Sequence, residues 1–184
     1  MIRIARESDI PKMIEIYAPY VLRTTHTFEY TVPTFEAFTQ RFQSITAQFP
    51  WIVWEEDGQV LGYAYGSAPF ERAAYAWCGE VSIYLAPEIH KRGIGRQLYE
   101  VLEAIMQKQG YLVIYALVTT ENTGSLAFHK KLGYRQTAVL PDCGIKFGRQ
   151  LGIVWLEKRF PVKSIPTQNP RPWNDFVRCY KSRF

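Results

Sequence analysis

Apolar positions near the start of the chain follow two different periods. Alternating apolar and polar positions predict a short strand at residues 2–4, and a helix capped by Ser8 follows because positions 10, 13, 14 and 17 are apolar at helical spacing. Residues 21–33 are rich in turn-forming and aromatic types. Behind Thr34, apolar residues at positions 35, 38, 42 and 45 predict a second helix. This part therefore predicts one strand and two amphipathic helices.

The middle of the chain indicates a hairpin and then a strand–helix–strand unit. Asp57 and Gly58 separate the apolar runs 51–55 and 60–66, which is typical of a hairpin turn. A strand is expected at residues 80–85, and a long helix then begins at Gly93 and ends at Gly110. The apolar run 112–118 follows directly. Because a helix connects the strands at 80–85 and 112–118, we expect them to be parallel.

The last part of the chain predicts the end of the domain and an appendage. A short helix at residues 125–132, ended by Gly133, and strands near 134–140 and 153–157 complete a mixed α/β domain over residues 1–160. Four prolines between positions 161 and 172 indicate a linker, and apolar residues at positions 173, 176, 177, 180 and 184 predict a short docking helix. We therefore expect one domain followed by a linker and helix at 161–184.

Composition and charge narrow the class of protein. The 184 residues are 47% hydrophobic, which suits one domain with a sizeable core, and no apolar run is long enough for a membrane span or a signal peptide. We therefore expect a cytoplasmic protein without membrane contact. Of the net charge of +5, residues 161–184 carry +4, so the body is nearly neutral and nucleic-acid binding is not expected. The three cysteines lack the paired spacing of a metal site, so no metal is predicted.

The segment before the long helix has the residue types of an anion-binding loop. The first N–H groups of a helix lack internal partners, glycines let the backbone approach a phosphate closely, and basic side chains add charge. The segment lacks the Gly-Lys-Ser/Thr of a P-loop, and a plain helix start explains it equally well. The candidate phosphate-binding residues are His90, Lys91, Arg92, Gly93, Ile94, Gly95 and Arg96.

Two motifs together resemble the GCN5-related N-acetyltransferase (GNAT) superfamily. The loop at 90–95 is similar to its Gln/Arg-x-x-Gly-x-Gly/Ala signature, and Asn122-x-x-Ser125 followed by His129 is similar to its later segment. The resemblance covers about residues 2–159 and implies an α/β GNAT fold, in which helices flank a mixed central sheet with splayed parallel strands. Further matches resemble the phosphinothricin and methionine sulfone acetyltransferases: Thr27-Phe28-Glu29, Arg72-x-x-Tyr75-x-Trp77-x-x-Glu80 and Gly144-Ile145-Lys146.

The resemblance also implies where acetyl-CoA binds. Its pantetheine arm would pair with the backbone of Ile83, Tyr84 and Leu85, its diphosphate would lie on the 90–96 loop, and Asn122 and Ser125 would add contacts. His90 stands where the superfamily prefers Gln or Arg, and residues 148–152 lack an aspartate that the subfamily usually shows.

Candidate catalytic residues follow from the same resemblance. Glu80 would be the general base, because burial beside Trp77 would raise its pKa toward neutrality. The alternative is an ion pair with Arg72. His129 stands where many members have a tyrosine acid, although a packing role is equally open. Direct transfer is favoured over a covalent carrier at Cys78.

The implied acceptor is a small amino-acid-like amine. Arg72 and Lys146 are the cations that would clamp a carboxylate, and Phe28 and Tyr75 would line the side-chain pocket. Peptide N-termini, polyamines and antibiotics remain alternatives, as does a sensor or scaffold that binds acyl-CoA without turnover. The tail and the habit of the family suggest a homodimer.

Overall fold

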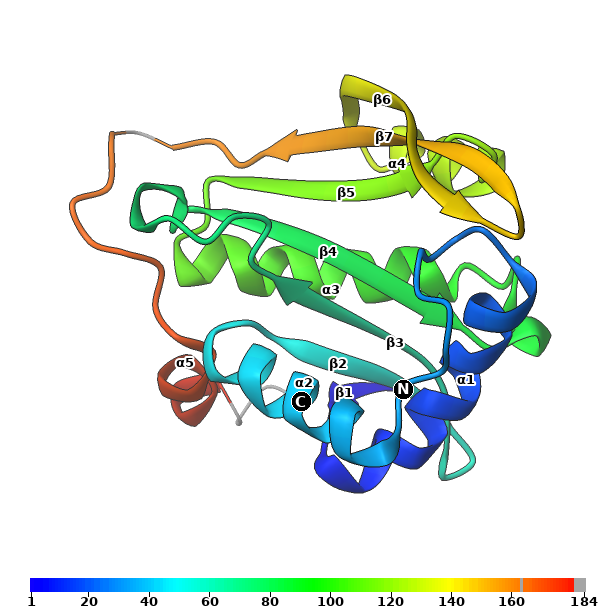
Figure 1. Cartoon of the computed structure of the whole chain (residues 1–184). Helices are drawn as coiled ribbons and strands as arrows, with labels where there is room; N and C mark the ends of the chain where they lie inside the picture. Colours follow the sequence, from blue (N-terminus) through cyan, green and yellow to red (C-terminus); the bar gives the residue numbers. More distant parts are fainter. Residues whose placement is uncertain (163, 181–184) are drawn as a thin grey trace.

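The computed structural model describes residues 1–162 and 164–180 and shows a twisted seven-stranded sheet between helices (Figure 1). The strand order is β1-β2-β3-β4-β5-β7-β6, and every neighbouring pair is antiparallel except β4 and β5. The predicted mixed α/β class and the single parallel pair are therefore confirmed. The strands are β1 (Ile2–Ile4), β2 (Trp51–Glu56), β3 (Gln59–Ser67), β4 (Cys78–Leu85), β5 (Val113–Thr119), β6 (Arg135–Lys146) and β7 (Arg149–Arg159).

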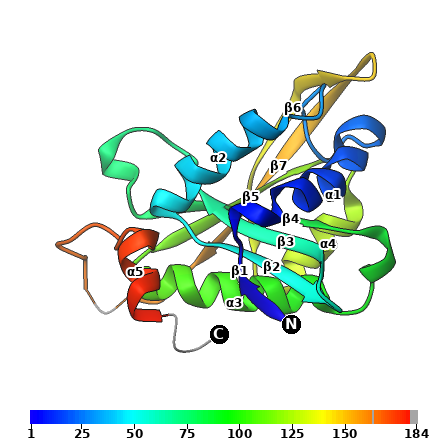
Figure 2. The same cartoon turned by 90° about the horizontal axis from the view of Figure 1, so that it is seen from below.

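Helices cover the two faces of the sheet unequally. Figure 2 shows α1 (Ile10–Arg23) and α2 (Phe35–Gln48) on one face and α3 (Ile94–Gln109) on the other. Two clusters of buried side chains correspond to these layers, one under α1 and α2 and a larger one under α3. The short α4 (Thr123–Lys131) lies beside α3, where the rings of Tyr99 and Phe128 are 5.3 Å apart. No helix in the described ranges combines the length and apolarity needed to cross a membrane.

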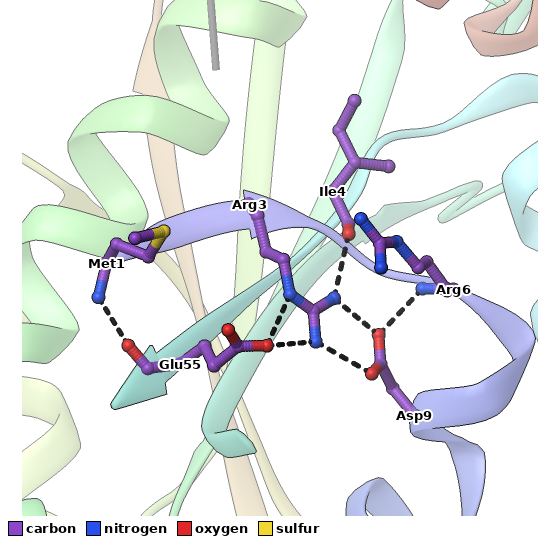
Figure 3. Close-up of polar contacts among 6 residues, drawn as sticks. All are labelled: Met1, Arg3, Ile4, Arg6, Asp9 and Glu55. Atoms are coloured by element: carbon purple, nitrogen blue, oxygen red, sulfur yellow. Dashed lines mark hydrogen bonds and ion pairs between the residues drawn. The ribbon is translucent and has the colours of Figure 1, made fainter. Parts of the chain in front are cut away.

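The start of α1 differs from the sequence prediction. A 3-10 turn at Glu7–Asp9 precedes the helix, and the Asp9 carboxylate, not Ser8, organises this corner (Figure 3). Asp9 accepts hydrogen bonds from both terminal nitrogens of Arg3, at 2.7 and 2.8 Å, and from the backbone N–H of Arg6 at 2.8 Å. Arg3 also donates to Glu55 at 2.6 Å. The prediction that Ser8 caps the helix is wrong, because Arg3 holds Asp9 in this place through charged hydrogen bonds that no local motif reveals.

The β6–β7 hairpin is longer than predicted. Short strands were expected at 134–140 and 153–157, but the pair runs from residue 135 to residue 159 around a turn at Phe147 and Gly148, both with positive φ. The register shifts between Leu140 and Gly144, where β6 bulges. Most of β6 is exposed at the sheet edge, so the apolar alternation that marks a half-buried strand is missing from its sequence.

The chain after β7 folds back on the domain. In α5 (Trp173–Tyr180), the side chains of Trp173 and Phe176 are buried in the core beneath α3. Figure 1 shows α5 beside α2, at the end of the molecule away from β6. Phe184, the last residue of the predicted docking helix, lies outside the described residues.

Candidate functional site

The two parallel strands form a fork. Only three residue pairs align β4 with β5, at Cys78/Val113, Gly79/Ile114 and Glu80/Tyr115, after which the strands separate (Figure 1). Hydrogen bonds alternate sides along a strand, and the N–H of Ala86 donates to Leu61 on the β3 side. The backbone groups of Val81, Ile83 and Leu85 therefore face into the fork.

A cleft of about 490 Å³ occupies the fork. Nine of the residues predicted from sequence line it: Ile83, Tyr84, Leu85, His90, Lys91, Gly95, Asn122, Ser125 and His129. His26 and Ser82 line the cleft as well. Sequence reasoning missed Tyr20, Val81, Tyr99, Ala116, Leu117, Val118, Gly124 and Phe128. These come from α1 and from strand and helix positions that look like ordinary core, so no local motif marks them.

The end of β4 is already bonded to side chains. Tyr20 donates its hydroxyl proton to the Leu85 carbonyl at 2.6 Å and lies 3.3 Å from the Leu85 N–H, while Nε2 of His90 lies 3.2 Å from the same carbonyl. Tyr84 is paired with Tyr63 of β3. Of the three residues expected to pair with pantetheine, Ile83 alone has backbone groups that are directed into the fork without such a partner.

The predicted phosphate loop places a helix N-terminus at the mouth of the cleft. A 3-10 turn at Pro87–Ile89 leads to Lys91 and Gly93, whose φ angles are 61° and 78°. Gly93 is the residue before α3, and a Cβ placed on it would meet nothing within 4 Å. Since α3 is 16 residues long, its first N–H groups present the positive end of a full helix dipole to this open space.

The basic side chains of this loop are used differently from one another. Arg92 forms a bidentate pair with Glu56 at 2.7 and 3.0 Å, and Arg96 pairs with Glu100 at 2.7 Å. Lys91 lines the cleft and has no ion pair among the described residues. Ile94 is buried in the core. Lys91 is therefore the cation of the loop that is directed to the cleft.

Glu80 is the last residue of β4 that pairs with β5. Its neighbour Val81 belongs to the core under α3, so alternation along the strand places Glu80 on the face that carries α1 and α2. Burial raises the pKa of Glu80. The alternative ion pair is not formed within the described part of the chain: Arg72 is exposed in the β3–β4 loop and makes no salt bridge there.

Both ring nitrogens of His129 have partners. Nδ1 donates to the Ser125 carbonyl at 2.8 Å, so Nε2 accepts from the Tyr99 hydroxyl at 3.0 Å. Burial lowers the pKa of His129, although the hydrogen bond to Ser125 opposes this. The imidazole is therefore neutral and fixed in orientation. Asn122 caps α4, because its side chain accepts the Ser125 N–H at 3.1 Å.

Two predicted acceptor residues belong to the contact between the α1–α2 loop and β6. Lys146 is 1% exposed and donates from Nζ to the Thr27 carbonyl at 2.7 Å. Burial lowers the pKa of Lys146, and Glu29 partly offsets this. The Phe28 ring packs on Gly144, where an added Cβ would lie 2.2 Å from Cε2 of the ring. Neither residue lines the cleft, and both hold the loop on the hairpin.

The remaining acceptor candidate, Tyr75, stands in an aromatic group. Its ring centroid is 4.7 Å from that of Phe70, which stacks on Trp155 at 5.7 Å with only 8° between the planes. Tyr115 of β5 meets Trp155 edge to face at 5.5 Å. The sequence motif pointed to Tyr75 alone; Phe70 lies five positions before it on the same loop, and Tyr115 and Trp155 come from distant parts of the chain.

Gly152, in the segment 148–152 that lacks the aspartate, lies in a crowded place. A Cβ placed on Gly152 would lie 2.9 Å from the Leu140 carbonyl and 3.3 Å from Cα of Pro141. Both belong to the bulge of β6, which presses against β7 at this point. With this bulge in place, only glycine fits at position 152.

Comparisons with known proteins agree with this geometry. A profile of the "Acetyltransferase (GNAT) domain" matches residues 2–155. The chain is similar to a phosphinothricin N-acetyltransferase of Alcaligenes faecalis, with 35% identity over 159 residues, 85% of this chain and 81% of that protein. It is also similar to an L-methionine sulfoximine/L-methionine sulfone acetyltransferase of Salmonella typhimurium, with 30% identity over 166 residues, 90% of this chain and 97% of that one.

A solved structure extends the similarity to three dimensions. The phosphinothricin acetyltransferase of Sinorhizobium meliloti, determined in complex with acetyl-CoA, superposes with a TM-score of 0.88 at 32% identity, covering 94% of this chain and 96% of that one. The resemblance expected from the motifs is therefore confirmed.

Proposed function

Because the chain belongs to the GNAT family of acetyltransferases, and is thus an N-acetyltransferase, we propose that it moves the acetyl group of acetyl-CoA to the α-amine of a small amino-acid-like acceptor. Phosphinothricin, methionine sulfone and methionine sulfoximine define the type, because these names describe what the relatives acetylate. The observation that carries the proposal is the fork of β4 and β5, with the half-buried Glu80 carboxylate at its closed end.

The residues of the fork fit acetyl-CoA. The cleft offers the inward backbone groups of Ile83, beyond the last residue pair of β4 and β5, to an extended amide-containing arm, which would add to β4 as another strand does. At its mouth, the N-terminus of α3, the open approach over Gly93 and the Lys91 ammonium suit a diphosphate. Arg92 and Arg96 would contribute only after leaving their carboxylate partners.

Glu80 is our candidate for the general base. An α-amine with a pKa of about 7.7 to 8.0 attacks a thioester only when neutral, so its proton must go to a base directly or through water. Burial raises the pKa of Glu80, which brings it closer to that of the amine. In the described residues no ion pair holds Glu80 in its charged form.

The departing thiolate needs only modest assistance. Its conjugate acid has a pKa of about 8.5, so water can protonate it near neutral pH. His129 remains a candidate acid, but its Nδ1 proton is held by the Ser125 carbonyl, and the geometry favours a packing and positioning role. Burial raises the pKa of the Cys78 thiol, which keeps it protonated and supports direct transfer over an acyl-cysteine.

For the acceptor, Arg72 is our candidate for the carboxylate clamp. It is exposed, lies on the loop that carries Tyr75, and its planar guanidinium suits bidentate pairing with a carboxylate. Lys146 and Phe28 would act indirectly, by holding the α1–α2 loop in place. Cytoplasmic location and homodimerisation stay predictions from the sequence.

A mass-spectrometric screen tests the proposal. Acetyl-CoA is incubated with phosphinothricin, methionine sulfone, methionine sulfoximine, a polyamine and a peptide with a free N-terminus, and both CoA and acetylated product are measured. We expect product from at least one of the amino-acid analogues. Saturable acetyl-CoA binding in calorimetry without product from any amine would instead support the sensor or scaffold, and product from the peptide or polyamine alone would replace the acceptor class.

A further inference from the structure

The Arg92 side chain of the 90–96 loop is held by a residue outside that loop. Glu56 is the last residue of β2, and its carboxylate accepts hydrogen bonds from both terminal nitrogens of Arg92, at 2.7 and 3.0 Å. Bidentate pairing fixes the plane of a guanidinium as well as its position. Arg92 is therefore turned toward the β2–β3 hairpin, and it does not line the cleft.

The hairpin presents Glu56 in a fixed place. Glu56 pairs with Gln59 in the ladder of β2 with β3, across a turn in which Asp57 has a positive φ of 50°. The residue before it, Glu55, accepts a hydrogen bond at its carbonyl from the N-terminal ammonium of Met1 (Figure 3). The carboxylate that holds Arg92 thus belongs to a well-anchored part of the sheet.

Arg92 stands beside the place that suits a diphosphate. Gly93 follows it directly, and the first N–H groups of α3 come next. A Cβ on Gly93 would meet nothing within 4 Å, so the space over this glycine is open. A guanidinium released by Glu56 would be one residue away from that space, and it carries several N–H donors suited to phosphate oxygens.

The pair of Arg92 with Glu56 is one that a diphosphate can compete with. The two side chains are 47% and 34% exposed, and an ion pair with that access to water contributes little to stability. Arg92 lowers the pKa of Glu56 through its hydrogen bonds and its charge, and the N-terminal ammonium acts in the same direction. If Arg92 left, the carboxylate would therefore keep a positive neighbour.

We propose that Glu56 sets the affinity of the site for coenzyme A by holding Arg92 away from the diphosphate. A bound diphosphate must either do without Arg92 or break its pair with Glu56, and both weaken binding. Acetyl-CoA and CoA carry the same diphosphate, so the weakening applies to substrate and product alike. Product CoA then leaves faster, because affinity differences within one site act mainly on the dissociation rate. This inference rests on the proposed function and concerns the regulation of the same site.

Calorimetry with CoA on four proteins tests the proposal: the native chain, Glu56→Gln, Arg92→Gln and the double variant. We expect Glu56→Gln to bind CoA about fivefold more tightly, which is the value of one well-formed exposed pair. Dissociation of CoA, followed by stopped flow, should slow by about the same factor. In the Arg92→Gln background, Glu56→Gln should gain at most about twofold, since only the general repulsion of an anion is then relieved.

Glu88→Gln is the matched control. Glu88 is exposed on the 3-10 turn that leads into the same loop, and it forms no ion pair in the part of the chain that the structure describes. The substitution removes the same charge as Glu56→Gln but releases no arginine. Its affinity for CoA should therefore rise by at most about twofold.

The outcomes separate this inference from the proposed function. Equal CoA affinity in the native protein and Glu56→Gln would overturn the inference, and so would an equal gain in Glu88→Gln or in the Arg92→Gln background. If the native protein bound no CoA, the proposed function and the inference would both be wrong. If Glu56→Gln tightened CoA binding as expected while no amine was acetylated, the role of Glu56 would stand and the proposed acetyl transfer would not.

Discussion

The burial of Glu80 affects both its proposed reactivity and the stability of the fold. Its burial raises its pKa, so the folded chain holds a proton that the unfolded chain has already released over the pH range between the two pKa values. Its contribution to stability is therefore present below the ordinary pKa of a glutamate and is lost as the pH rises through the raised value. At neutral pH the ionised form that the proposed base needs is therefore the form that is less favourable to the fold.

Glu80→Gln should accordingly separate activity from stability. We expect kcat to fall by about 100-fold or more, because a general base is removed, while calorimetry shows unchanged acetyl-CoA affinity and urea unfolding at pH 7 shows equal or greater stability. In the native protein, kcat/KM should decrease as the pH falls through the raised pKa. Glu15→Gln, which removes an exposed partner of Lys12 on α1, is the control and should change none of these. An undiminished kcat in Glu80→Gln would remove this residue from the mechanism.

Gly93 and Gly58 provide a matched pair for the phosphate loop. Their φ angles are 78° and 75°, and a Cβ on either would meet nothing within 4 Å. Alanine at either position should cost about 1 kcal/mol of unfolding free energy, since both impose left-handed backbone on a residue with a Cβ. Only Gly93→Ala should weaken CoA binding in calorimetry. Equal affinities for CoA in the two variants would show that the diphosphate lies elsewhere.

At the scale of elements, the contact between the α1–α2 loop and the β6–β7 hairpin closes one side of the site. Phe28 packs on Gly144, Lys146 donates to Thr27, and the Tyr30 hydroxyl donates to the Ile145 carbonyl at 2.6 Å. The loop thus has three separate attachments to the end of β6. Its conformation depends on a hairpin more than one hundred residues further along the chain.

Gly144→Ala should release this contact. The added methyl would overlap the Phe28 ring, so we expect a loss of about 1 to 3 kcal/mol in urea unfolding and a higher KM for the acceptor with an unchanged KM for acetyl-CoA. Ile145→Ala, at an exposed neighbouring side chain, should leave both constants as they are. If the acceptor KM of Gly144→Ala also stayed constant, the loop would have no part in acceptor binding.

How far the sequence predicts these elements depends on the range of the interactions involved. The helix α3 and the glycine-containing turn before it follow from the apolar period and the glycine positions, which are local signals. The ion pair of Arg92 with Glu56 joins residues 36 positions apart, and the hydrogen bond from Tyr20 to the Leu85 carbonyl joins residues 65 positions apart. No pattern along the chain encodes either interaction. Lys146 shows the limit of prediction from local motifs most plainly. Its motif suggested that it clamps the substrate, whereas its burial against Thr27 is a tertiary contact that the motif does not contain.

At the scale of the whole molecule, the C-terminal segment is part of the core. Trp173 is 3% exposed, the Gln109 side chain donates to the Arg171 carbonyl at 2.8 Å, and the Trp77 indole donates to the Gln168 carbonyl at 3.2 Å. Trp77 directly precedes β4 and its carbonyl accepts the Leu112 N–H at 2.9 Å. The C-terminal segment therefore stabilises the closed end of the fork through Trp77.

Trp173→Ala should cost about 3 to 5 kcal/mol of unfolding free energy, the usual range for a large aromatic side chain lost from a core. Ile165→Ala is the control, because Ile165 is 90% exposed, and its urea midpoint should match that of the native protein. A midpoint for Trp173→Ala close to the native one would show that the segment is dispensable for the fold.

The short parallel ladder between β4 and β5 also concerns the lifetime of the protein. The sheet leaves the inward N–H and C=O groups of Ile83 for a bound molecule, which would then take the place of an additional strand. Ligand at 100 times its dissociation constant adds about 2.7 kcal/mol to the free energy of unfolding. We therefore expect the rate of proteolysis of the protein to fall as the concentration of acetyl-CoA rises.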